Sequence, residues 1–191
     1  TVFIAAGLGA FEPRRLKIDG IDEFEEINLE YKVIDPTRYH GKDVVILGGG
    51  DSAFDWTLEL AEHANVVQVH RSQKFKAQPR SVAKMQELCA DFKMDFIEGT
   101  VTKFSAEDGR LTALTIRQKN GSVCRLELDE LLCFYGLSPK LGAIAKWGLE
   151  VKQKSIVVDT EKFQTSVDGI YAVGDINTYP GKKKLILSGF H

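Results

Sequence analysis

Apolar and polar positions follow their most regular pattern between residues 42 and 76. Four apolar residues at 44–47 are followed at once by three glycines at 48–50. Apolar residues then recur at helical spacing through 52–62, and a second apolar run covers 66–69. The order of strand, glycine turn, helix and strand predicts a nucleotide-binding βαβ unit.

The pattern beyond this unit predicts one more crossover and then an antiparallel meander. Helical spacing at 81–89 and a short apolar run at 94–97 extend the parallel sheet by one strand. Asp-Gly and Asn-Gly pairs, both typical of hairpin turns, then separate three strand-like segments: 101–104, 111–117 and 123–128. A buried strand is expected at 131–135.

Shorter elements are predicted toward the two ends of the chain. Strands are expected at 1–6, 155–159 and 170–173, and a short helix with a turn within 141–151. Residues 14–40 mix apolar, acidic and turn-forming positions, so we expect a connector outside the core. The last residues, up to His191, match the start of a helix.

The composition is typical of globular proteins, and the net charge gives the chain no general attraction to polyanions. Of 191 residues, 43% are hydrophobic and 27% are charged, and the net charge is −2. This balance argues against nucleic-acid partners, and no apolar run is long enough to span a bilayer, so we expect no membrane contact. The expected location is cytoplasmic.

The three cysteines indicate neither a disulfide framework nor a metal site. Cys89, Cys124 and Cys133 form no C-x-x-C pair, and no Cys/His spacing is typical of zinc. We expect reduced, structural thiols, with Cys133 in the core, and no bound metal.

Each residue of the glycine turn has a physical role in a nucleotide site. Gly48 would allow the tight turn, Gly50 the close approach of a pyrophosphate, and Ala53 the close packing of helix on strand. The phosphates would lie at the helix N-terminus, where unpaired N–H groups favour anions. The alternatives are a tight turn alone and helix capping by Asp51 and Ser52. The candidate site here comprises Gly48, Gly49, Gly50, Asp51, Ser52 and Ala53.

The second strand of the unit ends in cations where NAD-binding units place a carboxylate. His70 and Arg71 occupy this position, and no Asp or Glu occurs between Glu62 and Glu87. A guanidinium can bind two phosphate oxygens, so Arg71 is the first candidate for a 2′-phosphate ligand and the expected cofactor is NADP(H). Lys76 joins the candidate site, although the sequence does not rank it against two further cations, Lys74 and Arg80. The alternative is a solvated basic loop.

The flanks of the chain carry a family resemblance. The segment 165–175, which ends in Gly-Asp, resembles the closing FAD motif of flavoproteins that have two dinucleotide domains. Residues 1–13 resemble their other motif, a strand that ends in a glycine turn. Together with 48–56 and 178–182, these segments are most similar to the thioredoxin reductase-like ferredoxin-NADP reductases. The resemblance covers nearly the whole chain.

This resemblance implies a fold, a division into domains and a second cofactor. The fold class is α/β: a three-layer Rossmann-like NADPH-binding domain, with a parallel sheet plus antiparallel meander, flanked by partial FAD-domain segments. Residues 1–36 would end one FAD-domain piece and its connector, 37–137 would bind NADPH, and 138–191 would return to an incomplete FAD domain. Phe11 would lie against FAD and Asp175 would bind it; the alternatives are a core aromatic and a turn-capping carboxylate.

The resemblance also implies a reaction for a parent protein of which this chain is expected to be a fragment. Hydride would pass from NADPH to FAD, and electrons then to ferredoxin or flavodoxin, with no acid or base catalyst among these side chains. The full-length protein is expected to be a homodimer, and the fragment alone inactive. Alternatives are an NADP(H)-binding module without turnover and an FAD-dependent reductase with another acceptor. The absence of a C-x-x-C disfavours disulfide reduction, and Lys182-Lys183-Lys184 is either a docking site for an acidic acceptor or solvated surface.

Overall fold

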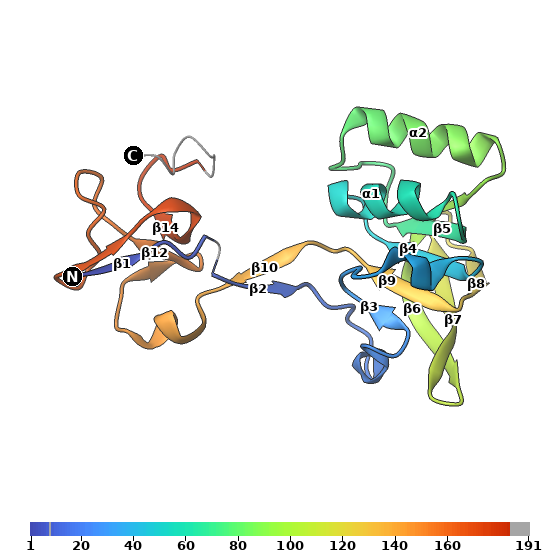
Figure 1. Cartoon of the computed structure of the whole chain (residues 1–191), viewed down its shortest axis with the longest axis horizontal. Coiled ribbons are helices and arrows are strands. Elements are labelled where there is room, and N and C mark those ends of the chain that lie inside the picture. The colour runs from blue at the N-terminus through green and yellow to red at the C-terminus, as the bar shows by residue number, and fades with distance from the viewer. Residues whose placement is uncertain (8, 184–191) are drawn as a thin grey trace. The chain divides into compact units, whose positions relative to one another are not determined.

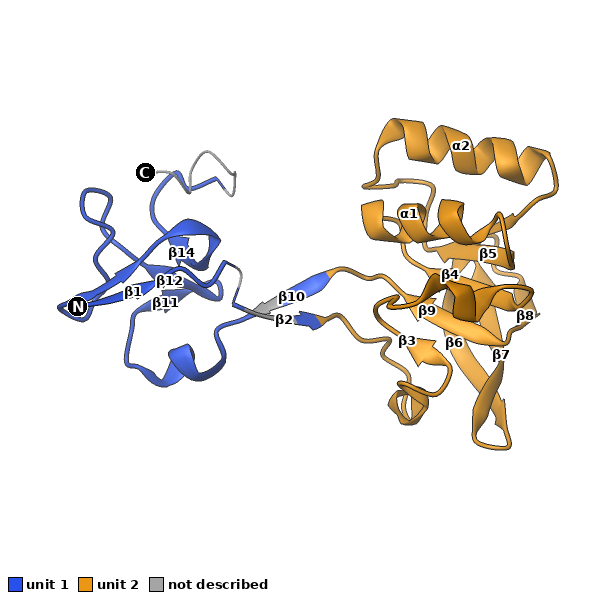
Figure 2. Cartoon of the chain, in the orientation of Figure 1, with its two compact units in different colours: residues 1–12, 137–191 blue, residues 13–136 orange. Residues whose placement is uncertain are grey.

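The structure is a computed structural model that describes residues 1–7 and 9–183. The chain forms two compact units, which Figure 2 shows in different colours. The larger unit comprises residues 13–136, and the described part of the smaller unit comprises residues 1–7, 9–12 and 137–183.

A seven-stranded sheet organises the larger unit (Figure 1). Its first five strands pair in parallel and its last three form an antiparallel meander, in which the strand at the junction belongs to both. This confirms the predicted α/β fold class. In spatial order the strands are β3 (Leu29–Glu30), β9 (Glu130–Cys133), β4 (Asp43–Leu47), β5 (Asn65–His70), β6 (Asp95–Glu107), β7 (Arg110–Gln118) and β8 (Val123–Glu127).

Both faces of the parallel strands are covered. Helices α1 (Asp51–Leu60) and α2 (Pro79–Ala90) lie on one face, where Ile46, Phe54 and Met85 belong to one apolar cluster (Figure 1). On the other face, Val45 and Val69 share a second cluster with side chains of the meander. The predicted strand, turn, helix and strand order of the βαβ unit is confirmed.

One strand is longer than expected. The apolar runs at 94–97 and 101–104 belong to a single strand, β6, which passes from the parallel ladder into the antiparallel one. Gly99 makes this possible, because a methyl group there would lie 2.6 Å from Ile116 Cγ2 and 2.8 Å from the Arg117 carbonyl oxygen. The hairpin turn at Asp108-Gly109 has two positive φ angles, 50° and 74°, as expected of a type I′ turn.

The prediction that residues 14–40 form a connector outside the core is wrong. Two 3₁₀ helices, η1 (Ile21–Phe24) and η2 (Pro36–Tyr39), and strand β3 lie in this segment. Ile21, Leu29 and Tyr39 are completely buried in the larger unit. The misinterpretation arose because single turns of helix and a two-residue strand leave no apolar periodicity. The larger compact unit, which begins at residue 13, includes this segment.

The smaller unit is built from short strand pairs around its own apolar cluster. The strands and short helix expected near 1–6, 141–151, 155–159 and 170–173 are present, and Ile4, Ile156 and Ala172 are buried together. The elements are β1 (Val2–Ile4) paired with β13 (Ile170–Ala172), β2 (Ala10–Pro13) with β10 (Leu137–Lys140), and β12 (Ser155–Val157) between β11 (Val151–Lys152) and β14 (Asn177–Thr178), with η3 (Gly142–Lys146) and η4 (Gly174–Ile176).

Some sequence predictions concern residues outside the described part of the chain, and another concerns a thiol. The expected helix start near His191, Lys184 and the side chain of Phe11 lie outside the described part of the chain. Cys133 is buried, as predicted, and burial raises the pKa of its thiol. Within residues 1–7 and 9–183, no helix is long and apolar enough to cross a membrane.

Candidate functional site

The glycine turn joins β4 to α1, and its first glycine is fixed by close packing. A methyl group at Gly48 would lie 2.6 Å from the Phe134 carbonyl oxygen and 2.8 Å from Ala53 Cβ. The φ angle of Gly48 is +151°, a region that side chains other than hydrogen rarely allow. Ala53 is completely buried against this turn, so the helix packs on the strand as closely as the sequence predicted.

The other two glycines of the turn differ in what surrounds them. A methyl group at Gly49 would lie 2.5 Å from Nε2 of His70, whose imidazole therefore covers this position. Nothing lies within 4 Å of the corresponding point at Gly50. The position at Gly50, at the start of α1, is therefore open.

The alternative in which Asp51 and Ser52 cap α1 is wrong. The N-cap is Gly50, and no side chain caps this helix end. The Asp51 carboxylate instead accepts a hydrogen bond from the backbone N–H of Gln78, at 2.9 Å, and Gln78 is the N-cap of α2. Asp51 thus ties the two helices together. The Ala53 N–H donates to the carbonyl oxygen of the N-cap Gly50 at 3.0 Å, whereas the N–H groups of Asp51 and Ser52 precede the first hydrogen bonds of α1. Such a helix end favours an anion.

A buried amide that we did not single out in the sequence supports the turn. Gln68 is completely buried, and its Nε2 donates to the Gly48 carbonyl oxygen at 3.1 Å. The Gly48 N–H in turn donates to the carbonyl oxygen of Val69, also at 3.1 Å. The available signal was one amide inside an otherwise apolar run, since a buried polar group needs a partner.

The loop from Arg71 to Gln78 brings the predicted cations to this edge of the sheet. The Lys76 N–H donates to the Gly49 carbonyl oxygen at 2.8 Å, so the loop is attached to the glycine turn. Phe75 anchors the loop, with ring centroids 5.0 Å from Phe54 and 5.5 Å from Phe96. Arg71, Lys74 and Lys76 of this loop are exposed, as is Arg80 in the first turn of α2.

His70 is half-buried between the glycine turn and Phe75, at a ring-centroid distance of 5.8 Å from the latter. Burial lowers the pKa of His70 below its ordinary value of 6.5, and the charge of Arg71 lowers it further. The hydrogen bond to the backbone at Lys74 and the charge of Glu98 act in the opposite direction. The neutral imidazole is therefore favoured at pH 7.

This shift predicts a pH dependence of folding. Because the folded pKa of His70 is below 6.5, the unfolded chain binds more protons in the window between the two values. Stability from this group is complete above pH 6.5 and is lost as the pH falls through the folded pKa. We expect melting temperatures at pH 7.5 and 5.5 to differ less for His70→Gln than for the unmodified chain. Equal differences would contradict the assignment.

Asp175, which the resemblance predicts to bind FAD, lies in the smaller unit, in a turn supported by hydrogen bonds. Asn177 is buried, and its Nδ2 donates to the Ala172 carbonyl oxygen at 2.7 Å. Lys182 Nζ donates to the Gly174 carbonyl oxygen at 3.2 Å. Asp175 itself is half-buried in the first turn of η4. We did not anticipate the role of Asn177, which follows the Gly-Asp pair by two residues.

The described residues offer no metal centre: no group of three or more His, Cys, Asp or Glu side chains among them is placed to hold an ion. A strand, an open glycine turn and an uncapped helix, followed by a parallel strand that ends in cations, have the arrangement of an α/β fold of the Rossmann type. Residues 1–186 match the family model described as pyridine nucleotide-disulphide oxidoreductase. The chain belongs to this family.

Curated relatives agree with the resemblance predicted from the sequence. The chain is 59% identical over 192 residues to ferredoxin-NADP reductase 2 of Cupriavidus taiwanensis, a match that covers all of this chain and 52% of that protein. It is 55% identical over 196 residues to ferredoxin-NADP reductase of Methylibium petroleiphilum, covering 54% of that protein. The predicted family resemblance is confirmed. The chain spans about half the length of the curated relatives it matches.

Solved structures share the fold. Thioredoxin reductase of Lactococcus lactis matches with a TM-score of 0.76 at 24% identity, over 98% of this chain and 60% of that one. Bacillithiol disulfide reductase of Staphylococcus aureus matches with a TM-score of 0.79 at 21% identity, over 98% and 58%. These likenesses show a common architecture.

Proposed function

We propose that this chain is the NADPH-binding part, with adjoining FAD-domain pieces, of an oxidoreductase that passes electrons to ferredoxin or flavodoxin. The observation that carries the proposal is the open position at Gly50, beside an uncapped helix end and a loop of exposed cations. A carboxylate that would select NAD at the end of β5 is replaced by His70 and Arg71.

The residues at this edge fit a phosphorylated dinucleotide. The N–H groups of the first turn of α1 would bind the pyrophosphate, and the absence of a side chain at Gly50 lets it approach the backbone. Arg71 would bind the 2′-phosphate, with Lys76 held nearby through its backbone bond to Gly49. His70 would contribute a neutral ring that covers Gly49.

The redox chemistry belongs to the cofactors when they are bound, and the protein binds and orients them. Asp175, in its supported turn, would accept a hydrogen bond from FAD, and Phe11 would lie against the flavin. The names of the curated relatives support ferredoxin as the acceptor and NADP as the nucleotide. A homodimeric parent protein and a cytoplasmic location, the latter supported by three free cysteines, are parts of the same proposal.

A calorimetric titration of the chain with NADP⁺ and then NAD⁺, at low salt, tests this proposal. We expect NADP⁺ to bind at least about tenfold more tightly, and Arg71→Ala to weaken it roughly 10- to 100-fold, the usual range for hydrogen bonds to a charged group. Arg125→Ala, which removes an exposed arginine of β8 in the meander, is the matched control and should leave binding unchanged. If a folded sample binds neither nucleotide, the proposal fails.

Two alternatives are separated by further measurements. A pure binding module predicts no flavin in the purified chain, so a stoichiometric flavin band in its visible spectrum would count against it. A reductase with another acceptor predicts that NADPH reduces the flavin of the full-length protein but that ferredoxin and flavodoxin do not reoxidise it.

A further inference from the structure

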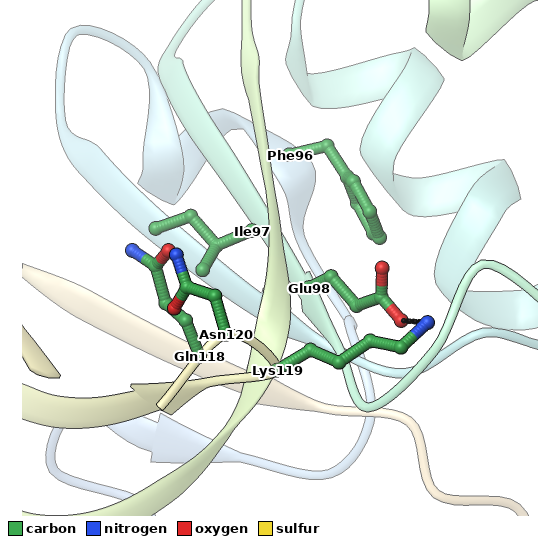
Figure 3. A pocket seen from close by; sticks show the side chains of 6 residues that line it. All are labelled: Phe96, Ile97, Glu98, Gln118, Lys119 and Asn120. Carbon is green, nitrogen blue, oxygen red and sulfur yellow. Dashed lines mark ion pairs between the residues drawn. The ribbon is translucent and has the colours of Figure 1, made fainter. Parts of the chain in front are cut away.

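A hollow of about 400 Å³ lies where β6 leaves the parallel ladder (Figure 3). Its lining comes from three consecutive residues of β6 and from three residues at the end of β7 and in the following turn. In Figure 3, the side chain of Lys119 extends toward that of Glu98. The lining residues are Phe96, Ile97, Glu98, Gln118, Lys119 and Asn120.

The register of the sheet places this hollow beside the proposed nucleotide site. His70 of β5 is paired with Glu98 of β6, two positions after Gln68 is paired with Phe96. Paired residues of adjacent parallel strands lie about 4.8 Å apart and direct their side chains to the same face. The Phe96 ring also contacts Phe75, the anchor of the basic loop. Glu98 therefore neighbours the residue that precedes Arg71.

A carboxylate in this place would oppose a bound 2′-phosphate, because both are negative. Glu98 is not left alone, however. Its Oε1 lies 2.9 Å from Nζ of Lys119, and the Lys119 N–H donates to the Glu98 carbonyl oxygen at 3.2 Å. The Glu98 side chain is only 15% exposed, whereas that of Lys119 is 73% exposed.

This pair has a structural role, because the mostly buried Glu98 carboxylate needs a charged partner. The position of the pair also matters for a ligand, since it determines whether the neighbour of His70 presents a negative charge or a neutral pair. NAD sites have a carboxylate at the end of the second strand of the unit, which is β5 here. This chain instead has Glu98 on the next strand, β6, where it forms an ion pair with Lys119.

We propose that the Glu98–Lys119 ion pair is a specificity element for the adenosine end of the nucleotide. The hollow receives part of the adenosine, and Lys119 neutralises Glu98 so that a 2′-phosphate is accepted there. This inference rests on the proposed function and deepens it. Lys119 acts chiefly through Glu98, and that distinguishes it from the direct phosphate ligand Arg71.

The test uses two small probes with the full chain: adenosine 2′,5′-bisphosphate, which carries the 2′-phosphate, and 5′-AMP, which lacks it. We expect Lys119→Met to weaken binding of the bisphosphate about tenfold and binding of 5′-AMP less than about twofold, as measured by calorimetry. In a Glu98→Gln background, the same Lys119→Met change should lower the affinity for the bisphosphate less than about threefold, because no carboxylate remains to be neutralised. Lys93→Met, which removes another exposed, acid-paired lysine, is the control and should change neither affinity.

The outcomes separate this inference from the proposed function. If Lys119→Met leaves the preference for the bisphosphate intact, or weakens both probes equally, the pair is not a specificity element. An equal cost of Lys119→Met with and without Glu98 would make Lys119 a simple phosphate ligand and overturn the shielding role. If the unmodified, folded chain binds neither probe, the proposed function fails and this inference with it.

Discussion

Replacement of Gly48 by alanine is expected to destabilise the larger unit by about 3 kcal/mol or more, within the upper range for overpacked sites. The added methyl group would meet the Phe134 carbonyl oxygen at 2.6 Å and Ala53 Cβ at 2.8 Å. Neither neighbour can move easily, since Phe134 continues β9 through a hydrogen bond to Leu47 and Ala53 lies on the buried face of α1. Urea unfolding measures the change, and the melting temperature should fall by roughly 10 °C.

Gly50→Ala is the matched control, because it adds the same methyl group two residues away. No atom lies within 4 Å of that point, and φ is −106°, which alanine adopts without strain. We expect a stability loss of at most about 1 kcal/mol, the difference between glycine and alanine at an N-cap. NADP⁺ affinity should nevertheless fall if Gly50 admits the pyrophosphate. Equal stabilities of the two variants would contradict the packing at Gly48.

The pattern of apolar and polar residues predicted those elements in which it repeats over several helical turns or several strands. Apolar spacing predicted α1, α2 and the central strands, and the two dipeptide turns predicted the meander. The close packing of α1 on β4 at Ala53 also followed from the sequence, because a small residue three positions after Gly50 permits it. The roles in cofactor binding of the candidate residues, among them Arg71 and Asp175, stay predictions.

Local pattern failed where a residue's partner is distant in the chain. The sequence around Gln68 gives one weak signal, an amide within an apolar run, and Asn177 resembles a surface amide. The structure shows that both are buried and bonded to backbone carbonyl groups. Asp51 has the residue type and position of a cap, yet the carboxylate reaches Gln78, 27 residues later. The same limit explains the misinterpreted segment 14–40, whose burial depends on β9 and the meander.

Asn28 offers the sharpest test of that corrected segment. It is completely buried, and its Nδ2 donates to the Leu111 carbonyl oxygen at 2.9 Å and to that of Asp129 at 2.8 Å. Its Oδ1 accepts the Leu111 N–H at 3.0 Å. One side chain thus joins the segment before β3 to the start of β7 and to the residue preceding β9.

We expect Asn28→Leu to lower the free energy of unfolding by about 3–5 kcal/mol, since it leaves buried backbone groups without partners at roughly 1–3 kcal/mol each. Asn28→Asp should be about as costly although its shape is the same, because it sets an acceptor oxygen against two carbonyl oxygens. Asn65→Ala, which removes one exposed hydrogen bond to Asp43 at 3.0 Å, should cost less than about 1 kcal/mol. Urea unfolding of the three variants provides the comparison.

The result bears on the nucleotide site as well as on the fold. A connector would tolerate Asn28→Leu, whereas a member of the core would not, and near-normal stability of this variant would restore the connector interpretation. Because β9 lies between β3 and β4, and the Phe134 carbonyl oxygen faces Gly48, loosening the segment at Asn28 should also loosen the glycine turn. We therefore expect amide hydrogen exchange at Gly48 and Ala53 to quicken in Asn28→Leu but not in Asn65→Ala.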